Sequence, residues 1–378
     1  MAALVQLQEM SGLYIGLMSG TSLDGIDGVL ADFSQEKMAV VGHASAPLDP
    51  DLRAELLALN TPGSNELHRA ALAGNALARS YADVVQSLLE RSGTPASAVR
   101  AIGAHGQTVR HRPQEFDGTG YTLQLINPSL LAERTGIAVV ADFRSRDVAA
   151  GGQGAPLVPA FHQGVFGRAG ETVLVLNIGG ISNLSVLGAD GSVAGFDCGP
   201  GNALMDHWCQ LHTGQAFDKN GAWAAQGQVL PDLLVTLLQE PFLHQPPPKS
   251  TGRDLFNPAW LAGSLALHAG ARPVDVQTTL TELTASACAT SASSYGKNSK
   301  LLAVCGGGAL NTHLMQRLQA LLPGASVLPT DALGLPALQV EAAAFAWLAR
   351  ETVRGRTGSL QSVTGAQGAR VLGAVYPA

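Results

Sequence analysis

The sequence predicts an α/β protein that consists of two related halves. The chain has 378 residues, which is more than one ordinary hydrophobic core organises and therefore favours two domains. Each half opens with an apolar strand, a turn of small residues and a second strand, and then alternates helices with strands. This repetition is typical of a duplicated α/β architecture, and we expect a cleft between the halves.

In the first half, apolar runs and the turns between them predict the elements. Strands are expected over 13–18, 26–33, 40–46, 99–104 and 137–141. The first two flank the small-residue turn 19–22, which favours a β-hairpin. The stretch 66–90 is rich in Ala and Leu and contains no Pro, so it predicts a helix. The charged and Gly-rich stretch 143–154 is expected to be a loop.

The second half repeats this opening. Strands are expected over 173–178, 182–187, 193–196 and 301–305. Helices are expected over 204–212, 274–293, 310–321 and 340–351. The first of these strands ends at Gly179-Gly180, and the last ends at Gly306-Gly307-Gly308.

The composition argues against several classes of protein. The net charge is −6, whereas a nucleic-acid partner requires a basic face. The first ten residues lack the basic start and apolar run of a signal peptide, and no stretch reaches the ~18 apolar residues of a membrane span. The four cysteines show no paired spacing, which favours reduced thiols over disulfides or a zinc site. We therefore expect a soluble, cytoplasmic protein.

Three turns of small residues follow apolar strands, at 19–22, 179–183 and 306–308. The sequence contains neither a P-loop motif nor a G-x-G-x-x-G fingerprint after a strand. Glycine lets a turn present successive backbone N–H groups to a phosphate without obstruction by side chains. Any one of these turns could be an ordinary strand end. Together they predict a phosphate clamp that closes across the cleft.

A fourth segment, 195–202, leads from a strand into a helix. Gly199 and Gly201 leave space around Asp197, and Asn202 is expected to cap the helix. The N-terminus of that helix favours a nearby anion. Asp197 is therefore a candidate general base at a strand end. The alternative is that Asp197 only braces the turn.

Taken in order, these and other short segments resemble the anhydro-N-acetylmuramic acid kinase family from residue 14 to residue 377. The segments that carry the resemblance are 15–27 (IGLMSGTSLDGID), 103–108 (GAHGQT), 140–144 (VADFR), 151–162 (GGQGAPLVPAFH), 177–183 (NIGGISN), 195–202 (GFDCGPGN), 249–253 (KSTGR), 305–308 (CGGG) and 341–347 (EAAAFAW). The ordered set is specific, although each glycine motif alone is weak. The chain departs from the family before Tyr14, at Ser145 and over 336–340, away from Asp197 and the glycine turns.

The resemblance implies the fold of actin, heat-shock ATPases and sugar kinases, with ATP in a cleft between two related actin-like domains. The domains are then expected at 1–142, completed by 365–378, and at 143–364. The implied reaction opens 1,6-anhydro-N-acetylmuramic acid hydrolytically and phosphorylates O6, giving N-acetylmuramic acid 6-phosphate and ADP in peptidoglycan recycling. A homodimer without nucleic-acid or membrane partners is also implied.

The resemblance further assigns roles to residues, with Asp197 as the catalytic base. The implied nucleotide-binding positions are Gly20, Thr21, Ser22, Leu23, Asp24, Gly25, Ile26, Asp27, Gly179, Gly180, Asn183, Gly306, Gly307 and Gly308. Mg²⁺ is expected as well, because phosphoryl transfer needs the charge of the β- and γ-oxygens neutralised. The sequence does not identify its ligands. Asp24, Asp27 and Glu341 are candidates, acting through water.

Four residues are candidates for binding the sugar: His105, Asp142, Arg144 and Glu341. Arg144 could bind a carboxylate or a phosphate, because its guanidinium forks onto both, or it could form an interdomain salt bridge with no role in binding. His105 could contact the sugar or brace its turn. Glu341 could reach the sugar or order a magnesium-bound water. For Lys249, a solvated loop charge is the simpler interpretation.

Two other functions remain open from the sequence. One is another small-molecule sugar kinase of the same superfamily. The other is a non-enzymatic ATP-driven switch, which would need an extended partner-binding domain or filament surfaces. Turnover of a panel of small acceptors with ATP separates these functions.

Overall fold

The computed structural model describes residues 12–20, 23, 25–35, 37–252 and 255–378. The chain divides into two compact units. Unit 1 contains the residues up to Phe161 together with Gln339–Ala378, and unit 2 contains His162–Leu338. The predicted boundaries, 142 and 365, are corrected to 161 and 339. Unit 1 therefore also contains residues 143–161 and 339–364, which were expected in the second domain.

The main sheet of unit 1 has six strands in the order β13-β7-β4-β1-β2-β3. Their bounds are β1 Leu13–Met18, β2 Gly25–Asp32, β3 Ala39–Pro47, β4 Ile102–Ala104, β7 Val139–Ala141 and β13 Ala374–Tyr376. The first three strands form an antiparallel meander, β4 pairs parallel with β1, and β7 pairs parallel with β4. The predicted hairpin is confirmed, and the C-terminal β13 pairs antiparallel with β7.

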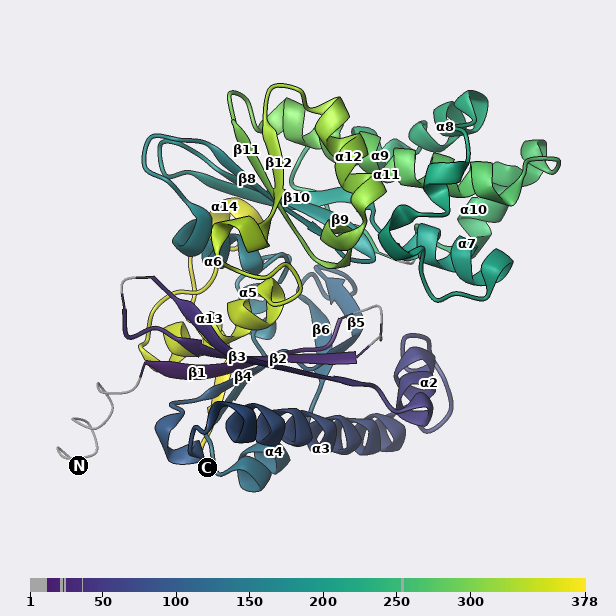
Figure 1. Ribbon diagram of the computed structural model, residues 1–378. Coiled ribbons are helices and arrows are strands. Elements are labelled where there is room, and N and C mark those ends of the chain that lie inside the picture. The colour runs from purple at the N-terminus through teal and green to yellow at the C-terminus, as the bar shows by residue number, and fades with distance from the viewer. Residues whose placement is uncertain (1–11, 21–22, 24, 36, 253–254) are drawn as a thin grey trace. The chain divides into compact units, whose positions relative to one another are not determined.

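Helix α13 (Val340–Val353) packs directly on this sheet through two glycines (Figure 1). Gly16 of β1 and Gly103 of β4 are neighbours in the parallel register. A Cβ added to Gly16 would lie 1.8 Å from the Ala342 carbonyl oxygen, and one added to Gly103 would lie 2.0 Å from that of Phe345. The strands and the helix backbone therefore touch without side chains between them. This contact is why α13, expected in the second domain, belongs to unit 1.

Helix α3 (Glu66–Ser92) covers the other face of the sheet (Figure 1). Its Val84 packs on Gly28 of β2, where an added Cβ would lie 2.6 Å from Val84 Cγ1. The other helices of this region are α2 Pro50–Ala58, α4 Pro128–Thr135, α5 Ser145–Ala149, α6 Val158–Phe166 and α14 Gln361–Thr364. The prediction of a loop over 143–154 is wrong in part, because α5 forms there and buries Val148.

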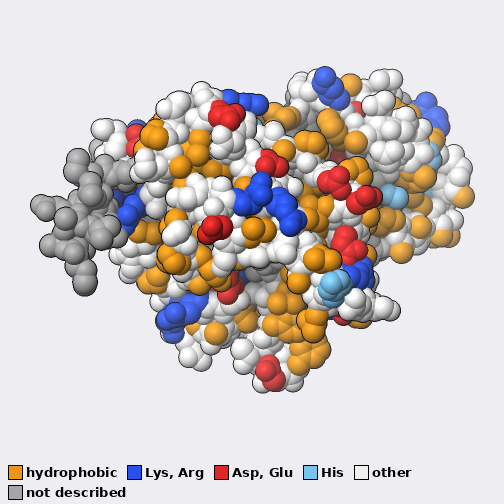
Figure 2. All heavy atoms as spheres, turned by 90° about the horizontal axis from the view of Figure 1, so that it is seen from below, with side chains coloured by type: hydrophobic (Ala, Val, Ile, Leu, Met, Phe, Trp, Pro, Cys, Tyr) orange, Lys and Arg blue, Asp and Glu red, His pale blue; other side chains and the backbone are white. Residues whose placement is uncertain are grey.

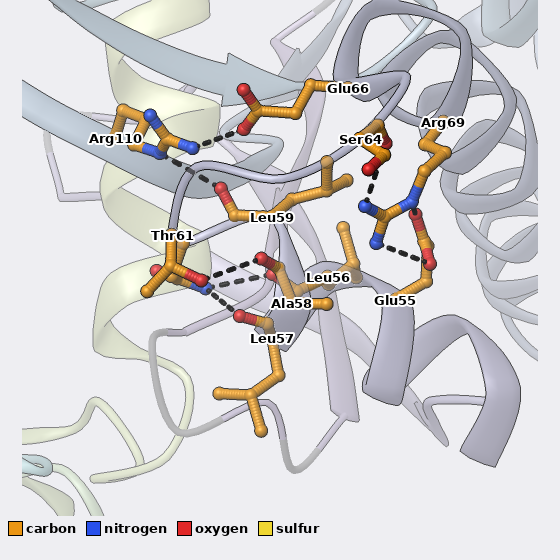
Figure 3. A network of polar contacts seen from close by, with 11 residues as sticks. Glu55, Leu56, Leu57, Ala58, Leu59, Thr61, Ser64, Glu66, Arg69 and Arg110 are labelled. Atoms are coloured by element: carbon orange, nitrogen blue, oxygen red, sulfur yellow. Dashed lines mark hydrogen bonds and ion pairs between the residues drawn. The ribbon is translucent and has the colours of Figure 1, made fainter.

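A hairpin of β5 (Gln107–Pro113) and β6 (Gly120–Leu125) forms a separate two-stranded sheet that was not predicted. The charged residues of β5 obscure the strand in the sequence. Figure 3 shows how Arg110 ties this hairpin to the linker between α2 and α3. Its Nε donates to the Leu59 carbonyl at 3.0 Å, and its Nη2 pairs with the Glu66 carboxylate. The middle of β5 is thereby held in place.

The sheet of unit 2 repeats the topology of unit 1. Its strands are β8 Val173–Ile178, β9 Ile181–Leu187, β10 Val193–Pro200, β11 Leu301–Cys305 and β12 Ser326–Pro329. They lie in the order β10-β9-β8-β11-β12, with an antiparallel meander of β8 to β10 followed by the parallel strands β11 and β12. Unit 1 has the same arrangement in β3-β2-β1-β4-β7. The predicted fold class, two related α/β domains, is confirmed.

The helices of unit 2 are α7 Ala203–Thr213, α8 Pro231–Leu238, α9 Pro241–His244, α10 Pro258–Leu265, α11 Pro273–Tyr295 and α12 Thr312–Leu321. The long α11 packs on β9 and β10. Within the described part of the chain, no helix combines the length and hydropathy needed to span a bilayer. On the face in Figure 2, Lys and Arg side chains occur in small groups beside Asp and Glu, without a broad basic field.

Candidate active site

Asp197 lies in β10, opposite Asn183 of β9 in the strand register. The strand was predicted to end at 196, but it continues to Pro200 through an irregularity between Asp197 and Gly199. Such an irregularity redirects side chains locally. An added Cβ at Gly199 would lie 2.7 Å from Leu243 Cδ2, so the Leu243 side chain would have to shift to admit one. Two predicted site residues, Asp197 and Asn183, are thus neighbours.

The Asp197 carboxylate is held through one of its oxygens. Oδ2 accepts a hydrogen bond from Ser250 Oγ at 3.0 Å and another from Thr251 N at 2.9 Å. Burial raises the pKa of Asp197 to about 6, against the opposing effects of these two bonds and of the Lys249 charge. A carboxylate with this pKa is ionised at neutral pH and basic enough to accept a proton. The arrangement suits a general base.

Lys249 is buried, so its interpretation as a solvated loop charge is corrected. Its ammonium donates to the carbonyls of Phe242 and Leu243, each at 3.2 Å, and lies 4.7 Å from the centroid of the Phe242 ring. The Lys249 carbonyl accepts a hydrogen bond from Asp197 N at 3.1 Å. Residues 249–251, here called the strap, therefore run along β10 beside Asp197. The sequence analysis did not predict this contact.

The two-glycine turn between β8 and β9 is fixed to the start of α7. The Gly179 carbonyl accepts from Asn202 N at 2.7 Å, and the Gly180 carbonyl accepts from Gly201 N at 3.0 Å. Asn202 was expected to cap α7, but its side chain makes no capping bond. Its Nδ2 donates instead to the Ile178 carbonyl at 3.0 Å. Since C=O and N–H point in opposite directions across a planar peptide, the N–H groups following these carbonyls are directed away from α7.

The third glycine turn lies beside the second. Strands β8 and β11 are parallel neighbours, with Cys305 opposite Asn177. Gly306 has a φ of +76°, and an added Cβ would lie 2.4 Å from Asn177 Oδ1. At Gly308, an added Cβ would lie 2.4 Å from Ile178 Cγ2. Unit 2 thus gathers two predicted nucleotide turns, and only glycine fits where they meet.

The first glycine turn belongs to unit 1, between β1 and β2. Its predicted positions Thr21, Ser22 and Asp24 lie outside the described residues. The positions Gly25, Ile26 and Asp27 are the first residues of β2. The Gly20 carbonyl accepts from Gln107 Nε2 at 3.2 Å, and the Leu23 carbonyl accepts from Arg53 Nε at 3.1 Å. Sequence reasoning missed both supports, since Gln107 and Arg53 lie 87 and 30 residues from the carbonyls that they hold.

Arg144 and His105 form a hydrogen-bonded pair in unit 1. Nη2 and Nε of Arg144 lie 3.0 and 3.3 Å from His105 Nε2, and Nη1 donates to the Gly154 carbonyl at 2.8 Å. Burial, aided by the Arg144 charge, lowers the pKa of His105 to about 3, so the ring is neutral and its Nε2 accepts. Burial also lowers the pKa of Arg144 to about 10, opposed by Glu341, and Arg144 remains cationic at neutral pH. His105 therefore supports Arg144.

Two carboxylates organise the segment that carries Arg144. Asp142 is exposed, has a φ of +57° and accepts a backbone hydrogen bond within its own turn at 3.3 Å. Asp147, which sequence reasoning missed, is fully buried and accepts from Gly154 N and Thr364 Oγ1, each at 2.8 Å. Asp147 thereby holds the loop whose Gly154 carbonyl binds Arg144. Its charge also acts on Arg144, where it favours the protonated form.

In the part of the chain that the structure describes, no three His, Cys, Asp or Glu side chains are grouped as metal ligands. Asp27 Oδ1 lies 3.4 Å from His43 Nε2, and Glu341 lies in the first turn of α13. Mg²⁺ usually keeps several waters and is bound through one or two carboxylates and substrate phosphates. Separate acidic residues of this kind fit such binding, but they do not form an all-protein metal site.

Comparison with known proteins identifies relatives along nearly the whole chain. The family model described as "Anhydro-N-acetylmuramic acid kinase" matches residues 12–378. A relative of that name from Variovorax paradoxus (strain S110) is 70% identical over 371 residues, which cover 97% of this chain and 99% of the relative. Another from Albidiferax ferrireducens (strain ATCC BAA-621 / DSM 15236 / T118) is 64% identical and covers 98% and 100%. A solved structure, the activator of the 2-hydroxyisocaproyl-CoA dehydratase from Clostridium difficile with bound ADPNP, aligns with a TM-score of 0.45 at 11% identity and covers 90% of this chain and 97% of that one.

Proposed function

Because the chain belongs to the anhydro-N-acetylmuramic acid kinase family, we propose that it is an ATP-dependent kinase acting on 1,6-anhydro-N-acetylmuramic acid. The reaction opens the anhydro bridge with water and phosphorylates O6, giving N-acetylmuramic acid 6-phosphate and ADP. Its place is the recycling of peptidoglycan sugars. The observation that carries the proposal is the family match over residues 12–378.

The bonding of the substrate explains why both water and ATP are consumed. O6 is bonded to C1, so it has no free hydroxyl to phosphorylate until that bond breaks. Water attacks C1 while its proton passes to Asp197, the C1–O6 bond breaks, and O6 takes the γ-phosphoryl group as ADP leaves. The phosphoryl group replaces the general acid of ordinary glycoside hydrolysis, so a single carboxylate base suffices. The raised pKa and hydrogen-bonded position of Asp197 support this role.

We assign the phosphates of ATP to the glycine turns at 20–27 and 179–180, and the adenosine to the turn at 306–308. Two observations support the assignment within unit 2. The carbonyls of Gly179 and Gly180 are bound to the start of α7, which directs the following N–H groups away from it. The neighbouring turn 306–308 consists of three glycines, so no side chain of the turn obstructs the approach of a ligand to its backbone.

We assign sugar binding to Arg144, with Asp142 and Glu341 beside it in unit 1 and His105 behind it. The lactyl carboxylate of the muramic acid is the partner that best matches a guanidinium. Arg144 makes no ion pair with any described residue, and its three hydrogen bonds to described residues go to a neutral ring and a carbonyl. The positive charge of Arg144 is therefore not neutralised by a salt bridge with a described carboxylate, and it is available to the carboxylate of a ligand.

Replacing Arg144 with Met is expected to raise the KM for the anhydro sugar by about 10- to 100-fold, with little change in the KM for ATP. Hydrogen bonds to charged groups are worth roughly 1.5–3 kcal/mol, which corresponds to this range. Steady-state kinetics with each substrate varied measures the effect. Arg146→Met is the matched control, because Arg146 is an exposed arginine two residues away. An equal KM for the sugar in Arg144→Met and wild type would exclude this assignment.

Turnover in ¹⁸O-labelled water tests the proposed reaction. We expect label at the C1 hydroxyl of the product and none in the phosphate ester, read before the anomeric oxygen exchanges with solvent. Label in the phosphate would mean that water attacks phosphorus, and the proposed chemistry would be wrong.

The turnover assay also tests the requirement for Mg²⁺. The ion would neutralise the β- and γ-phosphate oxygens, with Asp27 or Glu341 holding its waters. Full activity in excess EDTA would exclude that requirement.

The two alternative functions predict different results with other acceptors. A different sugar kinase would phosphorylate another sugar faster than the anhydro sugar, and an ATP-driven switch would hydrolyse ATP without any acceptor.

From family membership we also propose a cytoplasmic homodimer, which sedimentation of the purified protein and cell fractionation would test. Neither property enters the catalytic argument.

A further inference from the structure

The two oxygens of the Asp197 carboxylate have different surroundings. Oδ2 accepts both hydrogen bonds that reach this side chain, from Ser250 Oγ and Thr251 N. Oδ1 receives no hydrogen bond from any of the residues that the structure describes. The strap thus saturates one oxygen and leaves the other to an external proton donor.

The strap also makes contacts with residues of unit 2 other than Asp197, and these contacts hold it in place. The Lys249 ammonium is fixed by the carbonyls of Phe242 and Leu243 and by the Phe242 ring. Its backbone carbonyl is bonded to Asp197 N. Ser250 and Thr251 follow directly, so their donors reach the carboxylate from a fixed backbone. The bond from Ser250 is the only one of the two that a side-chain substitution can remove.

We propose that Ser250 is a positioning residue for the reaction: with the Thr251 amide it fixes Oδ2 of Asp197, so that Oδ1 takes the proton from the attacking water. This inference rests on the proposed function, in which Asp197 is the base. Ser250 itself touches no reacting atom. It acts by keeping the carboxylate ionised and by restricting its rotation.

The direction of the Ser250 effect follows from its hydrogen bond. A donor to the ionised form of a carboxyl lowers its pKa, so loss of that donor raises the pKa. Ser250→Ala should therefore move the acid limb of kcat/KM from near pH 6, the pKa that burial gives Asp197, upward by about 0.5–1 unit. Because a base works only when deprotonated, the variant loses more activity at pH 5.5 than at pH 8. With only the Thr251 amide left to hold Oδ2, the carboxylate is positioned less firmly, which should also lower kcat at pH 8 several-fold, with the KM for ATP unchanged.

The experiment compares pH profiles of kcat/KM for wild type, Ser250→Ala, Ser250→Thr and Ser192→Ala. Ser250 is exposed, so threonine keeps the hydroxyl without a clash, and it should restore the wild-type limb. Ser192 is the matched control, since its Oγ contacts Asp190 Oδ1 at 2.5 Å in the turn between β9 and β10. Ser192→Ala should leave the limb in place. Thermal melting of each variant verifies that the fold is intact.

An acid limb that stays at the wild-type pH in Ser250→Ala would overturn the proposal, as would an equal shift in Ser192→Ala. Failure of the proposed function gives a different result. If Asp197 is not the base, Asp197→Asn keeps its activity, and the wild-type acid limb cannot be assigned to this residue. Another combination of results would reject only the role of Ser250. In that case the wild type shows the acid limb and Asp197→Asn loses its activity, but Ser250→Ala leaves the limb at the wild-type pH.

Discussion

Replacement of Asp197 with Asn is expected to lower kcat by about 10²–10⁴, the usual effect of losing a general base. The amide occupies nearly the same volume but cannot accept the proton of the attacking water. In wild type, activity should fall as the pH drops through about 6, because burial raises the pKa of Asp197 to that value and protonation removes the base. Steady-state kinetics, with equilibrium binding of an ATP analogue, separates this chemical effect from a loss of binding.

The pH dependence of the stability of Asp197→Asn relative to wild type provides a control, because the direction of the difference is known. The folded-state pKa of Asp197 is above its ordinary value. Its ionisation therefore opposes folding, and the stability present at low pH is lost as the pH rises through the folded pKa. The Asn variant should melt no lower than wild type at pH 8, and any advantage should disappear near pH 4. Asp190→Asn, in the turn before β10, is the matched substitution and should retain activity. Wild-type turnover by Asp197→Asn would remove this residue from the chemistry.

Replacement of Gly16 with Ala is expected to destabilise the protein by about 3 kcal/mol or more, at the upper end of overpacking effects. The new Cβ would lie 1.8 Å from the Ala342 carbonyl oxygen and 2.5 Å from Ala346 N, both of which are backbone atoms of α13. A helix backbone cannot yield as a side-chain end can, so α13 must shift from β1. For a unit of this size the loss corresponds to a melting temperature lower by roughly 6–12 °C.

Gly263→Ala is the matched control for this prediction. Gly263 lies in α10, and a Cβ added there meets no atom within 4 Å. Alanine has the better helix propensity by about 1 kcal/mol, so this variant should be as stable as wild type or slightly more stable. Differential scanning calorimetry of both variants measures the contrast. Equal melting temperatures for Gly16→Ala and wild type would show that α13 does not rest on β1 in the way described.

The sequence by itself determined the features that depend on neighbouring residues. Apolar runs separated by small residues predicted the strand–turn–strand opening of both units, because strand burial and the backbone freedom of glycine are local properties. The same reasoning selected Asp197, which stands between small residues before a helix. The order of short motifs sufficed for the family, which the match over residues 12–378 bears out.

The tertiary structure alone decided which distant segments meet. α13 returns to unit 1 because Gly16 and Gly103 allow its backbone to touch two strands, and helix periodicity carries no information about such a partner. The hydrogen bond between Ser250 and Asp197 joins residues 53 positions apart. The bond between Asp147 and Thr364 spans 217 positions. Local patterns report which face of an element is apolar; they do not report which donor a buried carboxylate will find, because that depends on how the whole chain packs.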